Sequence, residues 1–480
     1  MRAPFGQSLA LLTDLYQLTM AFGYWREGLA DREAVFCQYF REAPFGGSFA
    51  IAAGLGTALD WLAELRFSDD DIAFLASLKG ADGTPLFEAA FLDYLGRLEF
   101  ACDVDAIAEG SAVFAHEPLL RVRGPLLQCQ LVETALLNII NFQTLVATKA
   151  ARVCLAAGDD PVLEFGLRRA QGIDGGLSAS RAAYIGGCAA TSNVLAGKMH
   201  GIPVRGTHGH SWVLAFGNER EAFQAFARAM PHNCVLLVDT FDTLEGVRNA
   251  IDVGVNLREN GAQLAGIRLD SGDLADLSIQ ARTLLDEAGL QDTAIVASND
   301  LDEDSITALK RRGAKIGIWG VGTSIASSGG QSALGGVYKL TLMRDTSGQW
   351  QARAKRSEES GKASLPGMLQ VRRYTVEDRL TADLIYDELH PPPRSCSGAE
   401  LESGNPSSEL TFEGEHRDLL QAVVAGGQIV AQADELDVLR LRCRSELAML
   451  PDEVIRARSS GGAPVWLEDG VRRRQLALLA

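Results

Sequence analysis

Between residues 151 and 334 the sequence alternates short apolar runs with longer stretches of helical character, and this alternation constrains the fold more than any other feature. The runs that we interpret as strands lie at 162–165, 204–206, 235–238, 264–269, 294–297 and 315–319. Most of them end in a polar or glycine-rich turn that leads into a helix. Repeated strand–loop–helix units are typical of a parallel sheet, and a series this long predicts a (β/α) barrel.

The regions on either side of this series have a different pattern. Residues 101–127 and 335–356 alternate as strands do, and a segment rich in Pro, Ser and Gly at 391–408 is interpreted as a surface loop. We therefore expect four regions: the N-terminal part of an α/β domain with a strand-rich segment at 1–150, a barrel catalytic domain at 151–334, returning strands and the C-terminal part of the α/β domain at 335–450, and a C-terminal tail at 451–480.

The charge balance excludes one large class of partners. Lys and Arg total 45 against 62 Asp and Glu, which gives a formal net charge of −17. A nucleic-acid-binding protein needs a basic surface, so no nucleic-acid partner is expected. The same charge repels anionic substrates, so a site for such a substrate needs strong local positive charge.

No segment has the pattern of a membrane span. The longest uncharged apolar stretch, 134–148, is shorter than the ~20 residues that a bilayer requires and contains Asn and Gln. The eight cysteines are scattered, and no two are spaced as CxxC. We interpret them as small core residues in a reducing compartment, and we expect a cytoplasmic protein without membrane contact.

The residues that follow the expected strands carry most of the chemistry. In a parallel barrel the carboxyl ends of the strands meet on one face, where catalytic residues are found. The segments at these ends contain arginines, carboxylates, two histidines and glycine-rich turns, and they lie at 164–169, 206–212, 239–242, 268–273, 298–300 and 320–324. A glycine-rich turn before a helix presents free amides to phosphate, and clustered carboxylates suit Mg²⁺ better than zinc. These residues predict a phosphorylated, anionic substrate and a hard divalent metal.

Each of these residues also has a purely structural interpretation. His208 and His210 could form a hydrogen-bonded loop pair, and Asp270 and Asp273 could cap the helix that follows them. The two arginines at the first strand end could be surface charges. We favour the functional interpretation because successive strand ends all carry polar or glycine residues.

Five motifs, in this order, resemble those of one enzyme family. They are Leu11–Met20 (LLTDLYQLTM), Glu164–Gly172 (EFGLRRAQG), Gly266–Asp273 (GIRLDSGD), Gly320–Thr323 (GVGT) and Leu334–Lys339 (LGGVYK). With them the chain resembles nicotinate phosphoribosyltransferases from residue 9 to about residue 370. The resemblance implies an irregular (β/α) barrel of the type II phosphoribosyltransferase kind, joined to a smaller α/β domain formed by both chain ends.

The resemblance also implies a reaction. Nicotinate and 5-phosphoribosyl-1-pyrophosphate would give nicotinate mononucleotide and pyrophosphate, a ligase-type step of NAD biosynthesis with ATP as co-substrate. ATP hydrolysis would be coupled to this step through a phosphohistidine. A homodimer with shared active sites is implied as well, in which Tyr16 reaches the site of the partner.

The resemblance identifies His210 as the residue that ATP phosphorylates. An imidazole is a suitable phosphoryl acceptor because it is nucleophilic and titrates near neutral pH. In the family an apolar residue and an alanine usually stand between the preceding threonine and this histidine, whereas this chain has His208 and Gly209 there. The register favours His210, and a shared role of His208 stays open.

The remaining site residues follow from the same resemblance. The catalytic residues are His210, Asp270 and Arg268; nicotinate is bound by Tyr16, Phe165, Thr207 and Arg268; and the phosphoribosyl and phosphate groups are bound by Arg168, Asp239, Asp270, Ser298, Asn299, Gly322 and Thr323. An aromatic ring suits the flat pyridine, and an arginine fork suits its carboxylate. Mg²⁺ would enter with the substrate pyrophosphate, with Asp270 and Asp273 as candidate protein ligands, and Lys355 and Lys362 lie in a segment that would reach the polyphosphate.

Three other functions compete with this interpretation. Nicotinamide phosphoribosyltransferases are similar but have an aspartate at the position of Ser192, where a carboxylate would repel nicotinate. A non-catalytic paralogue that binds pyridine nucleotides would not need the full set of His, Asp and Arg residues. A quinolinate phosphoribosyltransferase should have more basic strand ends. The sequence therefore favours nicotinate as the substrate.

Overall fold

The computed structural model divides into two compact units, and each is described by itself. Unit 1 combines Met1–Leu145 with Ala333–Ala480, and unit 2 is Val146–Ser332. The structure describes residues 9–355, 363–393, 395–401, 408–412, 414–432, 434–457 and 464–479. The unit formed by both chain ends is the longer of the two, and not the smaller as the resemblance implied.

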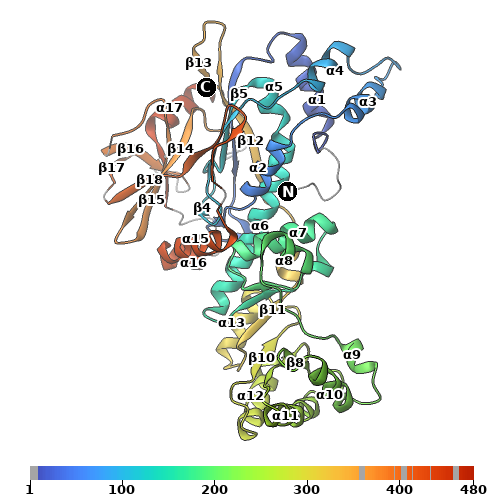
Figure 1. The fold of residues 1–480 in the computed structure, drawn as a ribbon. Coiled ribbons are helices and arrows are strands. Elements are labelled where there is room, and N and C mark those ends of the chain that lie inside the picture. The colour runs from blue at the N-terminus through green and yellow to red at the C-terminus, as the bar shows by residue number, and fades with distance from the viewer. Residues whose placement is uncertain are drawn as a thin grey trace. The chain divides into compact units, whose positions relative to one another are not determined.

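The core of unit 2 is one six-stranded sheet (Figure 1). Its strands, in sheet order, are β7 (Ala190–Thr191), β6 (Val162–Glu164), β11 (Ile318–Val321), β10 (Ala294–Ala297), β9 (Leu264–Leu269) and β8 (Cys234–Leu237). Every pairing between neighbours is parallel. The predicted parallel architecture is confirmed, and because β7 and β8 are its two edges the sheet is a curled half-barrel.

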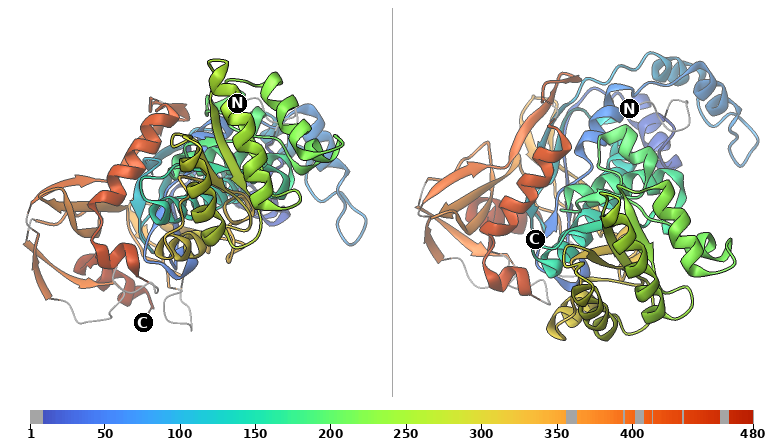
Figure 2. Two further views of the ribbon diagram at one scale, coloured as in Figure 1. Left: turned by 90° about the horizontal axis from the view of Figure 1, so that it is seen from below. Right: turned by 60° about the horizontal axis from the view of Figure 1, so that its bottom comes forward.

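Helices connect these strands. They are η2 (Leu167–Arg169), α7 (Gly172–Ile185), α8 (Val194–His200), α9 (His210–Leu214), α10 (Glu219–Ala229), α11 (Thr243–Glu259), α12 (Leu274–Glu287), α13 (Glu303–Arg311) and α14 (Thr323–Ala326), and the long helix α6 (Glu133–Ala157) contributes residues to both units. Several begin at a polar residue after a strand: the Asp242 carboxylate accepts the N–H of Glu245 at 2.9 Å, and Asp302 forms a capping box with Ser305. Figure 2 shows α10, α11 and α12 as the green-to-yellow helices beside the strands of unit 2.

Two of the strand predictions are wrong. Segment 204–206 is not a strand, because Val204 makes only an isolated bridge to Thr191. The strand at this place is β7, whose two residues are too few to leave an apolar run in the sequence. The strand expected at 315–319 begins instead at Ile318, since its pairing with β6 sets Trp319 opposite Val162.

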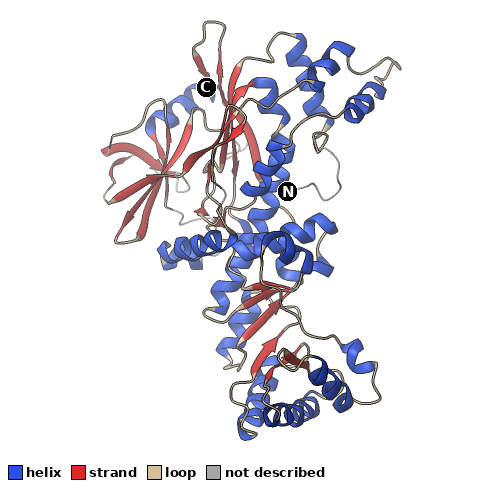
Figure 3. Ribbon diagram, viewed as in Figure 1, coloured by secondary structure: helices blue, strands red, loops and turns tan. Residues whose placement is uncertain are grey.

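Unit 1 contains two large sheets, drawn in red in Figure 3. The first is antiparallel and has the order β13 (Trp350–Ala352), β12 (Gly336–Arg344), β1 (Glu33–Phe40), β5 (Leu120–Pro125), β3 (Asp103–Ile107), β19 (Leu420–Ala425) and β20 (Gln428–Ile429). The second has the order β17 (Ser408–Thr411), β16 (Ser395–Glu400), β21 (Val465–Glu468), β15 (Arg379–Asp387), β14 (Leu369–Val376) and β18 (Glu415–Asp418). A short pair joins β2 (Ala50–Ile51) to β4 (Ala112–Val113). Strands from both ends of the chain therefore share the first sheet.

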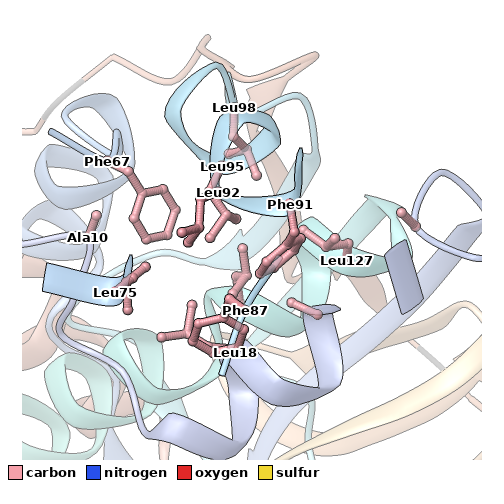
Figure 4. Packing of buried hydrophobic residues seen from close by; sticks show 13 residues of the cluster. Ala10, Leu18, Phe67, Leu75, Phe87, Phe91, Leu92, Leu95, Leu98 and Leu127 are labelled. Carbon is pink, nitrogen blue, oxygen red and sulfur yellow. The ribbon is translucent and has the colours of Figure 1, made fainter. Parts of the chain in front are cut away.

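The helices of unit 1 surround these sheets. They are α1 (Leu15–Arg26), η1 (Pro44–Gly46), α2 (Leu55–Ala63), α3 (Asp69–Ser77), α4 (Ala89–Gly96), α5 (Leu126–Leu131), α15 (Leu436–Met449), α16 (Asp452–Arg456) and α17 (Asp469–Leu479). Figure 4 shows where the N-terminal ones meet, in a core centred on Phe91, with Leu18 of α1, Leu75 of α3 and Leu127 of α5 around it. These side chains are almost completely buried, which fixes α1 against the helices of 69–96.

The C-terminal part of unit 1 is more ordered than the sequence predicts. The segment 391–408, expected as a surface loop, contains β16, which pairs with β17 and β21. The expected tail 451–480 contains α16, β21 and α17, and β21 lies inside the second sheet, between β16 and β15. A strand of only four residues, Val465–Glu468, gives too little alternation to be recognised without its partners.

No disulfide joins the eight cysteines, and those at 37, 102, 129, 188, 234 and 443 are buried. Within the described part of the chain, no helix combines the length and the apolar composition that a membrane span needs.

Candidate active site at the carboxyl edge of the parallel sheet

Arg268, the fifth residue of β9, joins three of the residues predicted for the site. Its Nε donates to Ser298 Oγ at 2.7 Å, and its Nη2 donates to Asp270 Oδ1 at 2.8 Å. Its Nη1 lies 3.4 Å from Thr207 Oγ1. The side chain is 15% exposed, so the guanidinium is held in place and still has one side toward solvent. A fixed, partly open arginine fork is suited to bind a carboxylate or a phosphate.

Two carboxylates lie beside this arginine. Asp239 follows β8, is buried, and accepts the N–H of Asp270 at 2.7 Å and the hydroxyl of Ser271 at 2.8 Å, both with Oδ2. Its other oxygen, Oδ1, is buried and has no hydrogen-bond partner among the described residues. Burial raises the pKa of Asp270, but the hydrogen bond from Ser298 and the charge of Arg268 outweigh burial, so the net pKa of Asp270 lies below its usual range.

His210 is the first residue of α9 and faces the same edge. Its Nδ1 lies 3.2 Å from Thr240 Oγ1, and its Nε2 lies 3.8 Å from Asp270 Oδ2. The imidazole is 43% exposed. The ring is therefore oriented by Thr240 on one side, while Nε2 stays accessible.

His208 has the opposite environment. The N–H of Leu237 donates to its Nε2 at 3.2 Å, and its Nδ1 lies 3.3 Å from the Gly209 carbonyl oxygen. Because Nε2 accepts, the ring proton sits on Nδ1. The ring is buried against Phe226, with 4.8 Å between centroids, and this burial lowers the pKa of His208. His208 is thus a neutral core histidine with both ring nitrogens in use.

Phe165 provides the aromatic surface of the site. The Arg268 guanidinium carbon lies 5.7 Å from the centroid of its ring. The ring passes over the backbone of Gly320, where a Cβ would come within 2.8 Å of two ring carbons. A Cβ on Gly322 would likewise meet the Phe165 carbonyl oxygen at 2.9 Å. The glycines of this turn are thus required by the close approach of β6 to β11.

The predicted phosphate ligands lie at the same edge but have fewer contacts. Arg168 is exposed in η2, and Gly322 precedes α14, whose first residue Thr323 is exposed. Asn299 is exposed and has a φ of 115°, an uncommon backbone conformation for a residue that is not glycine. The structure therefore places exposed residues, one of them with a strained backbone, where phosphate binding was predicted.

Asp273 is different from Asp270. Its Oδ1 accepts N–H groups at the start of α12, and Arg312 donates to both of its oxygens, at 2.9 and 2.7 Å. The structure thus gives Asp273 the capping role that was the alternative interpretation. Of the two candidate metal ligands, Asp270 keeps its Oδ2 outside the Arg268 fork, whereas Arg312 contacts both oxygens of Asp273.

The carboxylates present fit a metal ion only together with a substrate. Among the residues that the structure describes, no group of three or more His, Cys, Asp and Glu side chains is arranged to hold a metal. Mg²⁺ commonly uses one or two carboxylates plus substrate phosphates, and the free oxygens of Asp239 and Asp270 fit that pattern.

Other predicted residues belong to unit 1. Tyr16 lies in α1, is 48% exposed, and has a pKa raised by burial and by the nearby Glu133. Lys355 is exposed in the same unit, and Lys362 lies outside the described residues.

Sequence reasoning missed two residues of the site. Thr240 orients His210, and Ser271 supports Asp239. Each directly follows an acidic residue that was predicted for the site. Its position after a strand is therefore the signal that could have identified it.

Comparisons with known proteins agree with this arrangement. The family model of the nicotinate phosphoribosyltransferase (NAPRTase) N-terminal domain matches residues 11–141. The chain is 46% identical over 386 residues to nicotinate phosphoribosyltransferase from Bacillus subtilis, covering 79% of this chain and 77% of that protein. It is 41% identical over 427 residues to nicotinate phosphoribosyltransferase from Dictyostelium discoideum, covering 79% of this chain and 71% of that protein. The crystal structure of human nicotinic acid phosphoribosyltransferase is similar with a TM-score of 0.85 and 34% identity, covering 97% of this chain and 99% of that one.

Proposed function

This chain belongs to the nicotinate phosphoribosyltransferase family, and on that premise we infer that it joins nicotinate to 5-phosphoribosyl-1-pyrophosphate in NAD biosynthesis. It is a phosphoribosyl-transfer enzyme, and the proposed products are nicotinate mononucleotide and pyrophosphate. The observation that carries the proposal is Arg268, which is tied to Thr207, Asp270 and Ser298 and lies beside the ring of Phe165.

We assign the pyridine of nicotinate to Phe165 and its carboxylate to Arg268 and Thr207. A flat aromatic ring stacks on Phe165, while the guanidinium fork meets the carboxylate with charge-assisted hydrogen bonds. Ser192, directly after β7, adds no negative charge here, so we expect the acid to be preferred over the amide. A comparison of initial rates with nicotinate and with nicotinamide tests this assignment, and faster turnover of the amide would contradict it.

The transfer step needs little proton movement. The pyridine nitrogen has a free lone pair, and it attacks the anomeric carbon as pyrophosphate leaves. Positioning of the two reactants and stabilisation of developing charge therefore supply most of the rate. We assign the ribose to Asp270 and Asp239, and the phosphates to the backbone amides at the turn of Gly322, where α14 begins. A bound Mg²⁺ would neutralise negative charge on the departing pyrophosphate.

His210 is the proposed phosphoryl acceptor for ATP. Its Nε2 is accessible, and Thr240 on the other ring nitrogen sets the orientation. His208 is unsuited to the same role because it is buried and uses both nitrogens in contacts with backbone. We therefore assign the modification to His210 alone.

The test compares mononucleotide formation with and without ATP in the wild type and in His210→Ala. We expect the variant to turn over without ATP and to show no stimulation by it. The exposed His232 is changed to Ala as a control and should keep the full response to ATP. Full stimulation of His210→Ala would show that another residue carries the phosphoryl group, and binding of mononucleotide without any turnover would favour a non-catalytic paralogue.

The remaining features are proposed from the family. We propose a cytoplasmic homodimer in which Tyr16 of one subunit completes the site of the other. Mixed dimers of Tyr16→Ala and His210→Ala subunits would then recover part of the ATP-stimulated activity, because one of their two sites is intact.

A further inference from the structure

Glu164 is a buried carboxylate that the proposed chemistry does not use. It ends β6, is 1% exposed, and both of its oxygens are occupied. Its Oε1 accepts the N–H of Gly166, and its Oε2 accepts the hydroxyls of Ser180 at 2.9 Å and Thr191 at 2.6 Å. Burying a carboxylate costs free energy, which its hydrogen bonds offset. A buried carboxylate with three donors therefore rigidifies the elements that supply them.

These bonds surround Phe165, to which we assign the pyridine, and Ser192, whose lack of charge favours the acid in our proposal. Phe165 lies between Glu164 and Gly166, and both of those residues belong to the network. Ser192 lies between Thr191, which donates to Glu164, and Asn193, whose N–H donates to Thr191 Oγ1 at 2.9 Å. The Ser192 N–H itself donates to the Glu164 carbonyl oxygen at 2.9 Å. Glu164, itself one neighbour of Phe165, thus holds the other neighbour, Gly166, and through Thr191 it holds both neighbours of Ser192.

The network also reaches the helices behind the strands. Ser180 is in α7, and Asn193 Nδ2 lies 3.2 Å from its hydroxyl and 3.3 Å from the Gly176 carbonyl oxygen. Asn193 caps α8 by accepting the N–H of Ala196 at 3.2 Å. The strand ends are therefore fixed to α7 and α8 as well as to each other.

The backbone alone would hold this part of the sheet weakly. β7 has two residues, its pairing with β6 comprises only Leu163 with Ala190 and Glu164 with Thr191, and its other side makes only the isolated bridge of Thr191 to Val204. Arg268, by contrast, belongs to the longer strand β9, which is paired on both sides, and Asp270 directly follows that strand. The backbone at Ser192 therefore depends more on side-chain contacts for its position relative to Phe165 than the backbone at Arg268 does.

We propose that Glu164 is a positioning residue that sets the selectivity for the pyridine base by fixing the separation between Phe165 and Ser192. It does not touch the substrate, because both oxygens are occupied and the side chain is buried. The inference rests on the proposed function, since it assumes that nicotinate lies between these two residues. It predicts that a weaker network loosens the base site and leaves the phosphoribosyl site unchanged.

The principal test is Thr191→Val, which removes one donor to Glu164 at nearly constant volume, with Thr191→Ser as the matched control that keeps the hydroxyl. We expect KM for nicotinate to rise about tenfold, the typical loss for a hydrogen bond to a charged group, while KM for 5-phosphoribosyl-1-pyrophosphate stays within about twofold. The preference for nicotinate over nicotinamide should fall, and Thr191→Ser should restore it. Glu164→Gln should have the same effects, more strongly.

Amide hydrogen exchange, measured without substrates, tests this inference independently of the proposed function. Exchange of peptides that contain the amides of Gly166 and Asn193 should be faster in Thr191→Val and normal in Thr191→Ser. If exchange is faster but both KM values and the preference for the acid are unchanged, the inference is wrong. It is also wrong if both KM values rise together in proportion to lost stability. If the wild type does not turn over nicotinate at all, the proposed function fails, whatever the exchange shows.

Discussion

Each unit contains an arginine paired with an aspartate, and the two pairs differ in what surrounds them. In unit 1, Arg373 of β14 is 1% exposed and donates to Asp383, to Glu446 and to the carbonyl oxygen of Ala112. In unit 2, Arg268 donates to Asp270 and Ser298, but it is 15% exposed and its partner Asp270 is 27% exposed. The residue types are the same, and the difference is how many hydrogen-bonding positions are left open.

The difference separates structural charge from functional charge. Arg373 has protein partners in every direction, so its network can hold β14 and β15 but cannot receive a ligand. Burial, and after it the charge of Asp383, raises the pKa of the neighbouring Glu117 well above its usual value. At the carboxyl edge of the parallel sheet, by contrast, Asp239 Oδ1 has no hydrogen-bond partner among the described residues, and His210 Nε2 lies 3.8 Å from Asp270 Oδ2. Open positions near a fixed arginine mark the site better than the number of charges does.

Arg373→Met should have the largest effect on stability. The change leaves Asp383 buried without its cation and Glu446 with only Arg417, and breaking a buried ion pair typically costs about 3–5 kcal/mol of unfolding free energy. Urea unfolding measures the loss, and the folded fraction should keep its kcat. Arg456→Met is the control, because its ion pair with Asp452 is 80% and 70% exposed and should contribute little. Equal losses of unfolding free energy in Arg373→Met and Arg456→Met would contradict this prediction.

His116 makes the stability of unit 1 depend on pH. Burial, followed by the charge of Arg41, lowers the pKa of His116 to about 4. The unfolded chain binds this proton below about pH 6.5, so unfolding free energy should fall as the pH drops from there to 4, by about 3 kcal/mol in all. His116→Asn removes the titration and tolerates the φ of 68° at this position, so its stability should vary less in that window. Parallel curves for the wild type and the variant, measured by urea unfolding at pH 4 to 7, would show that the prediction is wrong.

Asp270→Asn should affect activity more than stability. Asp270 is partly open, so its loss leaves no buried uncompensated charge, but Arg268 loses the carboxylate that orients it. We expect kcat/KM to fall about 10- to 100-fold, as for a lost charged hydrogen bond, with a small change in urea midpoint. Asp276→Asn, on the exposed side of α12, is the control and should keep normal kcat/KM. If Asp270→Asn unfolded like Arg373→Met, the two networks would not differ as described.

The sequence allowed many of the site residues to be predicted because strands and polar turns alternate strongly there. Asp239, Asp270 and Ser298 each follow an apolar run, and parallel pairing brings such residues to one edge. The edge strand β7 was missed because two residues carry no periodicity, and the true role of Thr191 depends on Glu164, which is 27 residues away. The C-terminal strand β21 was missed for the same reason, since its partners are distant in the sequence.

The sequence by itself determined the parallel α/β class of unit 2, the family, and the candidate residues at the strand ends, because apolar periodicity and motifs are local properties. Only the tertiary structure decided which of those candidates face the site and which have structural roles. His208 and His210 are two residues apart, yet one is buried under Phe226 and the other is open beside Asp270. Asp270 and Asp273 are three residues apart, and one faces the site while the other caps a helix and pairs with Arg312. Burial and partners come from distant elements, so no local pattern contains them.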